Sequence, residues 1–377
     1  MATLILTGQK EELNNSSNEI LSGEWVKYNN HNLKNKPTIE YHWSDYTKVE
    51  KDYNYLKELY SKLIPSFTKY LNIYHQENRP IRYWEIIIGP WVVDILSMLW
   101  DRWEIINRCL KEDINEIYIS KHNQEALINS DYMDLMISRV SKDDHKWNHM
   151  IFSEILKFIN PNNIVLKEIL IDQKQNYNSF NSHLKFRKKK TFIKFLNFIF
   201  KNRKILFYEN QLTFCNKILF SWYSKSPIIS IPSFDVNFDL NIKVDRKNIQ
   251  ELSFLTSNNF EKFIKIFLPK IIPLSYLEGY EKILKISEKI DLNPKIIISH
   301  YGQVSNDLFK IWLANMHLKN KKIVICYHGG SLEKYAFLNY YENICDLLLS
   351  RYKFNKKKVL QLPPSFLIKK KKILKKN

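Results

Sequence analysis

The chain has 377 residues, and its length, composition and charge exclude several classes of protein. A single hydrophobic core stops growing at about 250–300 residues, so about two domains are expected. Hydrophobic residues make up 45% of the chain and aromatic residues 14%, which excludes a largely disordered protein. The formal charge of +19 indicates an anionic partner, such as a nucleic acid, an anionic membrane surface or a phosphorylated substrate. An AT-rich coding sequence, which raises the Lys content without any binding role, is the alternative explanation of this charge.

The first 165 residues are predicted to combine short strands with long helices. Strands are expected at residues 4–7, 18–22 and 116–119, and helices at residues 51–74, 131–138 and 145–158. The apolar run at residues 4–7 is far shorter than that of a signal peptide, so a cytoplasmic location is expected. The four cysteines lie far apart without a CxxC pair, which predicts reduced thiols and no metal site.

Residues 82–104 have the sequence RYWEIIIGPWVVDILSMLWDRWE, and the part at residues 83–100 nearly reaches the length of about 20 apolar residues that spans a membrane. The segment contains Glu85 and Asp94, and each charge costs about 2.5–3.5 kcal/mol at a bilayer centre, so a membrane span is rejected. Because proline fits the first turn of a helix but not its interior, two helices are predicted, the second starting at Pro90. Trp91 and Ile95 share one face of that helix, which favours a buried core helix over a base-stacking surface.

The middle of the chain is rich in Asn, Lys and Phe and has weak periodicity. We expect an insertion at residues 166–255 with short helices at 192–200 and 211–221. Its KFRKKK run at residues 185–190 is expected to be a solvated loop, with an anion-binding site as the alternative.

The pattern becomes regular again after residue 259, with helices expected at 260–268 and 275–290. A strand at 295–299, a helix at 306–318 and a strand at 322–327 predict a βαβ unit with parallel strands, and a further strand is expected at 345–350. Ligands bind at the carboxyl ends of such strands. The sequences SHYG, residues 299–302, and YHGG, residues 327–330, are therefore predicted to lie on one rim and to form the candidate site.

The chemistry of this rim centres on a histidine. His328 precedes Gly329 and Gly330, which allow close backbone approach to a ligand, and an imidazole can take up or release a proton near neutral pH. A structural turn is the alternative interpretation. Glu342 and Asp346 are four residues apart on a predicted helical face and could orient such a histidine. No Walker or GxGxxG loop occurs, so no cofactor is expected.

Three blocks of the sequence carry a resemblance to a known family. They are ILSGEWVKYN, HQENRPIRYWEIIIGPWVVDILSMLWDRWE and IVICYHGGSLEKYAFLNYYENICDLLLSRYKF. In this order they resemble a transferase family of bacterial surface-polysaccharide (O-antigen-type) gene clusters, which is similar to two-lobed GT-B glycosyltransferases. The resemblance implies an α/β fold with a Rossmann-like parallel sheet, that of the N-terminal GT-B-type lobe, and a large helical insertion. The expected regions are 1–165 (N-terminal α/β), 166–255 (insertion), 256–350 (βαβ portion of the same lobe) and 351–377 (basic tail).

The function implied by the resemblance is transfer of a sugar or related group from a nucleotide-activated donor to a hydroxyl of a glycan acceptor. His328 is then the general base. The other residues expected to contact the substrate are His300, Gly302, Gly329, Gly330, Glu342 and Asp346.

Proteins of this type continue into a donor lobe, whereas this chain ends in LPPSFLIKKKKILKKN. We therefore expect a truncated C-terminal lobe, which would leave the chain inactive alone, or a separate donor-lobe chain. A non-catalytic partner protein or degenerate half-enzyme is the alternative, and a basic nucleic-acid-binding protein is a third hypothesis. No nucleic-acid partner is expected, because no recognised module is visible. Peripheral contact of the cytoplasmic protein with the anionic inner membrane stays open.

Overall fold

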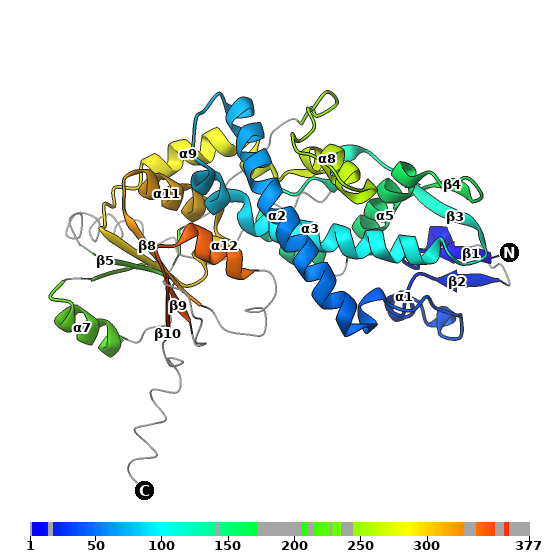
Figure 1. Ribbon diagram of the computed structural model, residues 1–377, viewed down its shortest axis with the longest axis horizontal. Coiled ribbons are helices and arrows are strands. Elements are labelled where there is room, and N and C mark those ends of the chain that lie inside the picture. The colour runs from blue at the N-terminus through cyan, green and yellow to red at the C-terminus, as the bar shows by residue number, and fades with distance from the viewer. Residues whose placement is uncertain are drawn as a thin grey trace, which may run out of the picture. The chain divides into compact units, whose positions relative to one another are not determined.

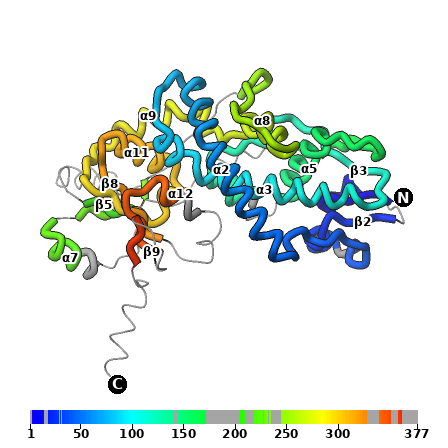
Figure 2. The backbone as a smooth tube through the Cα atoms, in the orientation of Figure 1, coloured from blue at the N-terminus to red at the C-terminus, as the bar shows by residue number. Residues whose placement is uncertain are grey.

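The computed structural model describes residues 2–13, 18–140, 144–171, 205–209, 214–226, 228–231, 233–234, 244–327, 337–350 and 358–361. The chain forms two compact units, each assembled from separate stretches of sequence. Unit 1 comprises Met1–Tyr70, Trp91–Asn178 and Leu240–Leu277, and unit 2 comprises Leu71–Pro90, Ser179–Asp239 and Glu278–Asn377. The two longest described helices, α2 (Tyr46–His75) and α3 (Ile81–Cys109), supply residues to both units. The course of both helices can be followed in Figure 2.

Unit 1 is built on a four-stranded parallel sheet in the order β2-β1-β3-β4. Its strands are β1 (Ala2–Ile5), β2 (Glu19–Leu21), β3 (Ile114–Lys121) and β4 (Val165–Leu170). Its further helices are α1 (Trp25–Asn29), α4 (Tyr132–Asp134), α5 (His145–Ile159) and α8 (Asn259–Ile271). Short helical turns are η1 (Lys10–Glu12), η2 (His31–Leu33), η3 (His42–Ser44), η4 (Gln124–Leu127), η5 (Leu135–Val140) and η6 (Leu274–Tyr276).

Unit 2 is built on a six-stranded parallel sheet in the order β10-β9-β8-β7-β5-β6 (Figure 1). Its strands are β5 (Ile205–Tyr208), β6 (Ile228–Ile231), β7 (Ile296–Ser299), β8 (Lys322–Cys326), β9 (Leu347–Ser350) and β10 (Val359–Gln361). Its helices are α7 (Phe214–Tyr223), α9 (Tyr280–Glu288), α10 (Gly302–Ser305), α11 (Asp307–Leu318) and α12 (Phe337–Ile344). The α/β class and the parallel strands are confirmed, and the strands divide between two sheets.

Helices cover both faces of the unit 2 sheet. Successive side chains of a strand point to opposite faces. On β5, the Tyr208 ring stacks on Phe309 of α11 with centroids 3.7 Å apart. Its neighbour Phe207 instead meets Phe220 of α7, edge to face at 5.1 Å. The helices α11 and α7 therefore lie on opposite faces of β5, which explains why every side chain of this short strand is buried.

Helix α3 corrects the prediction of two helices, because it runs unbroken through Pro90. A proline has no N–H to donate to the carbonyl four residues earlier, here that of Ile86. The Tyr340 hydroxyl lies 3.3 Å from this carbonyl and donates to the Gln303 carbonyl at 2.7 Å, so its single proton is shared and replaces the missing helical bond only in part. Among the described helices α3 alone is long and apolar enough to cross a membrane, but 78% of its most apolar window is buried. Burial of Trp84, Trp91 and Trp103 agrees with the predicted core helix.

The segment GEWVKYN, which follows the predicted strand at residues 18–22, forms a helix for which the sequence analysis made no prediction. The strand β2 ends at Leu21, and α1 begins at Trp25. Gly23 makes this turn, since a Cβ atom there would lie 2.0 Å from the Trp25 ring. The indole ring folds back over the glycine, and the chain leaves the sheet.

Three cysteines are free thiols, as predicted. Cys109 and Cys345 are buried and Cys326 is half-buried, while the side chain of Cys215 lies outside the described residues. Burial raises the pKa of Cys109 and Cys326 to about 12 and that of Cys345 to about 11. Such thiols are protonated at neutral pH and are poor nucleophiles.

Candidate active site at the carboxyl edge of unit 2

The strand order of unit 2 locates a candidate ligand site. The chain passes from β5 to β6 on one side, returns to the other side of β5 with β7, and then continues outward to β10. The order therefore reverses between β5 and β7. In open parallel sheets, ligands bind at the carboxyl ends of the strands at such a reversal. We call the residues Glu209, Ser233, His300 and Ser305, which follow these strands, the switch-point site.

Glu209 and His300 leave neighbouring strands at the same level. The last paired residues of β5 and β7 are Tyr208 and Ser299, and each is followed directly by one of the two site residues. The His300 N–H donates to the Tyr208 carbonyl at 3.4 Å, and the Glu209 N–H donates to Ile231 of β6 at 3.0 Å. The predicted site residue His300 thus lies beside an acidic residue that the sequence analysis missed. Glu209 is the single acid among residues 185–225, a signal that could have identified it.

The backbone and the carboxylate of Glu209 are both unusual. Its φ of 47° falls in the left-handed region, which is uncommon for residues other than glycine and concentrates at functional sites. Its half-buried side chain is hydrogen-bonded to Ser233, after β6, and to Ser305, in α10. Burial raises the pKa of Glu209 above its ordinary value, and the two serines offset this only in part. A carboxyl group of this kind can exchange a proton closer to neutral pH.

A rigid frame holds the loops of the switch-point site. The buried Tyr208 hydroxyl accepts the Phe234 N–H at 2.8 Å. Asn306 caps α11 by accepting the Phe309 N–H at 2.8 Å, and its amide donates to Ser233 Oγ at 3.3 Å. The loop after β6 is therefore tied both to β5 and to the start of α11.

Gly302, which was predicted to contact the substrate, is buried next to the residues that hold these loops. A Cβ atom at Gly302 would lie 2.2 Å from Tyr208 Cε1 and 2.9 Å from Phe309 Cδ1. The glycine is thus required by the stacked Tyr208 and Phe309 rings. Its contact with substrate stays a prediction.

The proposed general base lies outside the described residues, as do Gly329 and Gly330. The segment is described as far as Tyr327, whose N–H donates to Leu349 at 2.9 Å. Since β8 is parallel to β7 with Ile325 opposite Ser299, the chain leaves β8 at the same edge as His300. The rim position predicted for YHGG is consistent with this exit, and the role of His328 stays a prediction.

The structure places Asp346 at the other edge of the sheet. Helix α12 ends at Ile344, so Asp346 is not on the helical face expected for Glu342 and Asp346. Asp346 Oδ2 accepts the N–H of Ile323, at the start of β8, at 2.8 Å, and Oδ1 lies 3.3 Å from Arg82 Nη1. Burial raises the pKa of Asp346, but the Ile323 N–H and Arg82 outweigh it and hold the pKa below its ordinary value.

Because of these contacts, Asp346 is an ionised carboxylate that connects the start of β8 to Arg82 of α3. It lies at the edge of the sheet where the strands begin, whereas His300 lies at the edge where they end. Glu342 lies on the last turns of α12, where its carbonyl is 3.4 Å from Lys358 Nζ. The structure therefore brings together His300 and Glu209 but not His300 and Asp346.

Unit 1 has a comparable reversal between β1 and β3. There the carboxylate of Glu12, which is fully buried, accepts the backbone N–H groups of Leu6, Thr7 and Gln9 at 2.8–3.0 Å. Nε2 of the buried His149 lies 3.2 Å from its Oε1 atom. Burial raises the pKa of Glu12, yet His149 and these N–H groups hold it below the ordinary value. The carboxylate is saturated by protein donors and holds the loop after β1.

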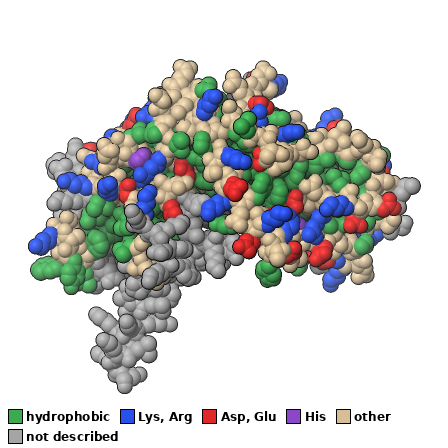
Figure 3. Space-filling model, in the orientation of Figure 1, with side chains coloured by type: hydrophobic (Ala, Val, Ile, Leu, Met, Phe, Trp, Pro, Cys, Tyr) green, Lys and Arg blue, Asp and Glu red, His purple; other side chains and the backbone are tan. Residues whose placement is uncertain are grey.

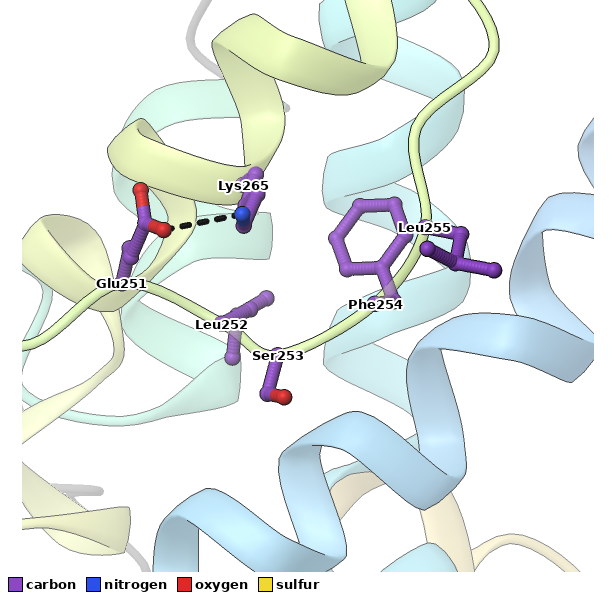
Figure 4. A pocket seen from close by; sticks show the side chains of 6 residues that line it. All are labelled: Glu251, Leu252, Ser253, Phe254, Leu255 and Lys265. Atoms are coloured by element: carbon purple, nitrogen blue, oxygen red, sulfur yellow. Dashed lines mark ion pairs between the residues drawn. The ribbon is translucent and has the colours of Figure 1, made fainter.

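A pocket in unit 1 is a weaker candidate. Figure 4 shows that residues 251–255 and Lys265 of α8 line it, and the Glu251–Lys265 ion pair, at 2.8 Å, already occupies its charged groups. Its lining residues come from one loop and one helix, so this pocket does not lie at the ends of strands where the strand order reverses.

A parallel α/β fold with a histidine and a half-buried carboxylate at a reversal of strand order is typical of proteins that bind and transform a ligand at the carboxyl edge. The family model of the LIC12162 family transferases matches residues 2–377, and the chain belongs to this family. No curated protein and no solved structure matches the chain. The predicted resemblance to a transferase family is confirmed at this level.

Proposed function

We propose that the protein transfers a sugar or related group from a nucleotide-activated donor to a hydroxyl of a glycan acceptor, in surface-polysaccharide synthesis. Membership of a transferase family supports group transfer. The observation that carries the proposal is the position of Glu209 and His300 directly after the neighbouring strands β5 and β7, at the switch point of unit 2 and on the edge where the YHGG segment follows β8. In this proposal, unit 2 corresponds to the acceptor-side lobe of a GT-B-like enzyme.

The reaction requires a proton acceptor. The acceptor oxygen forms a bond to the transferred group while the bond from that group to the donor phosphate oxygen breaks, and the phosphate leaves with the electron pair. The hydroxyl proton passes to His328, the proposed general base. Glu209 accepts a hydrogen bond from a substrate hydroxyl and orients it, while Lys and Arg side chains offset the phosphate charge.

A transfer assay tests this function. The purified chain is incubated with a panel of nucleotide sugars and oligosaccharide acceptors, and products are identified by mass spectrometry. We expect Glu209→Gln and His328→Asn to reduce transfer by about 10²–10⁴-fold, the usual contribution of such groups. The matched control is Glu281→Gln, since Glu281 is an exposed acid of the same unit that forms an ion pair with the exposed Lys285. Wild-type transfer rates in both site variants would refute the proposal. If the chain alone transfers nothing, calorimetry with nucleotide sugars separates the cases: absent binding means that a separate donor lobe is required, whereas tight binding without transfer would refute the proposal.

A further inference from the structure

Helix α7 of unit 2 presents an apolar side that no described residue covers. Ile218 and Leu219 are each 52% exposed, Trp222 is 80% exposed and Tyr223 is 81% exposed. Residues four positions apart are neighbours on a helix surface, so Ile218 lies beside Trp222 and Leu219 beside Tyr223, and the two pairs form adjoining parts of one broad apolar side. Phe220 faces the sheet, where its ring meets Phe207. Figure 3 shows the corresponding hydrophobic patch at the lower left, next to a basic side chain.

The excess positive charge of the chain is concentrated in two stretches of unit 2, one of which contains this helix. Residues 185–225 contain 11 Lys or Arg and one acid, and residues 351–377 contain 11 Lys or Arg and no acid. Since the whole chain has a charge of +19, the remaining residues carry a net charge of −2. A codon bias would spread lysine along the chain. Both basic stretches belong to unit 2, and the exposed Lys225 follows α7 directly.

An exposed apolar face, followed by Lys225 and carried by the unit that holds the excess positive charge, fits one kind of surface best. Tryptophan and tyrosine prefer the headgroup level of a bilayer, and leucine and isoleucine enter the acyl boundary. Lysines near that surface are attracted to anionic lipids. A nucleic acid would satisfy the charge but would leave Ile218 and Leu219 in water.

We propose that α7 docks unit 2 on an anionic membrane, with Ile218, Leu219, Trp222 and Tyr223 entering the interface and Lys225 at the headgroups. This inference does not depend on the proposed transfer reaction. A helix of ten residues is about 15 Å long, and α7 connects β5 to β6, so docking would keep the switch-point site close to the lipid surface.

Co-sedimentation with vesicles tests the proposal on the full chain. We expect binding to vesicles that contain phosphatidylglycerol, little binding to pure phosphatidylcholine, and weaker binding at high salt. The variant Trp222→Ser/Tyr223→Ser should bind at least about tenfold more weakly, because two large apolar side chains no longer leave water. The matched control is Tyr28→Ser/Tyr46→Ser, which removes two equally exposed tyrosines from unit 1, at 84% and 87%, and should bind like the wild type.

Several results would overturn the proposal. They are absence of binding to anionic vesicles, equal loss in the control variant, and unchanged binding of the α7 variant. A wild-type dimer that Trp222→Ser/Tyr223→Ser converts to monomer, measured by light scattering, would show that a second copy covers the face. Tight binding to duplex DNA without vesicle binding would assign the charge to nucleic acid. Circular dichroism establishes that each variant is folded.

Discussion

Replacing Glu209 should make the protein more stable and less active. Two features of this residue oppose folding, its left-handed backbone and its half-buried carboxylate. A left-handed conformation costs an L residue about 1–2 kcal/mol, and glycine costs about 0.5–1 kcal/mol in backbone entropy. Glu209→Gly should therefore stabilise unit 2 by about 0.5–1 kcal/mol, or roughly 1–4 °C in the unfolding midpoint.

The charge contributes separately, and Glu209→Gln isolates it because glutamine keeps the backbone strain. Folding raises the pKa of Glu209 above its ordinary value of 4.5, so the folded state favours the protonated form. The stability from this group is complete below the unfolded pKa and is lost as pH rises through the folded pKa. The wild type should lose stability relative to Glu209→Gln as pH rises above about 4.5, and the two should converge at lower pH.

Thermal unfolding between pH 4 and pH 8, followed by circular dichroism, measures both effects. Because the two units need not unfold together, hydrogen exchange of peptides from residues 205–209 and 296–305 assigns the change to unit 2. Lower stability of Glu209→Gln at neutral pH would refute the reasoning. It would mean that the bonds to Ser233 and Ser305 outweigh the burial cost and that the carboxylate is a structural group.

Three further predictions concern positions that support the two sheets. Glu12→Ala leaves His149 and the N–H groups of the loop without their acceptor, so the free energy of unfolding of unit 1, measured in urea, should fall by about 3–5 kcal/mol. Hydrogen exchange at residues 2–13 should become faster, and unchanged protection of these residues would contradict the prediction. Gly302→Ala forces the Tyr208 ring to move and should cost about 1–3 kcal/mol, measured by thermal unfolding, whereas an unchanged midpoint would mean that the ring shifts freely. Asp346→Asn should cost about 1–3 kcal/mol at neutral pH. Since folding lowers the Asp346 pKa, wild-type stability falls as pH drops through the folded pKa, and a variant with the same acid dependence would refute this contribution.

Much of the unit 2 sheet could be predicted from sequence, because strands buried on both faces appear as continuous apolar runs. The predicted strand at 295–299, helix at 306–318 and strand at 322–327 correspond to β7, α11 and β8 within one residue at each end. β5 could not be recognised in the same way. Its four residues are too few to show a period, and basic and aromatic residues surround them.

The error at Pro90 has a different physical origin. Local rules end a helix before a proline because one carbonyl loses its donor. In α3 the Ile86 carbonyl instead shares the hydroxyl proton of Tyr340, a residue 254 positions away from Ile86 in sequence. No local pattern contains this information, so only the tertiary structure shows that the helix continues.

The candidate site depends on strand order in the same way. The βαβ pattern was sufficient to place His300 on the carboxyl edge, but it could not show that β5 is the other neighbour of β7. The isolated acid Glu209 stands out in sequence, but it can be assigned to the site of His300 only once that neighbour is known, because its carboxylate meets Ser305 across the reversal of strand order. Asp346 shows the converse. Its spacing from Glu342 predicted that both lie on one helix, but α12 ends at Ile344, and Asp346 lies at the edge of the sheet where the strands begin. For this fold, the acid that can serve a rim histidine is therefore decided by which strands are adjacent, and sequence spacing does not decide it.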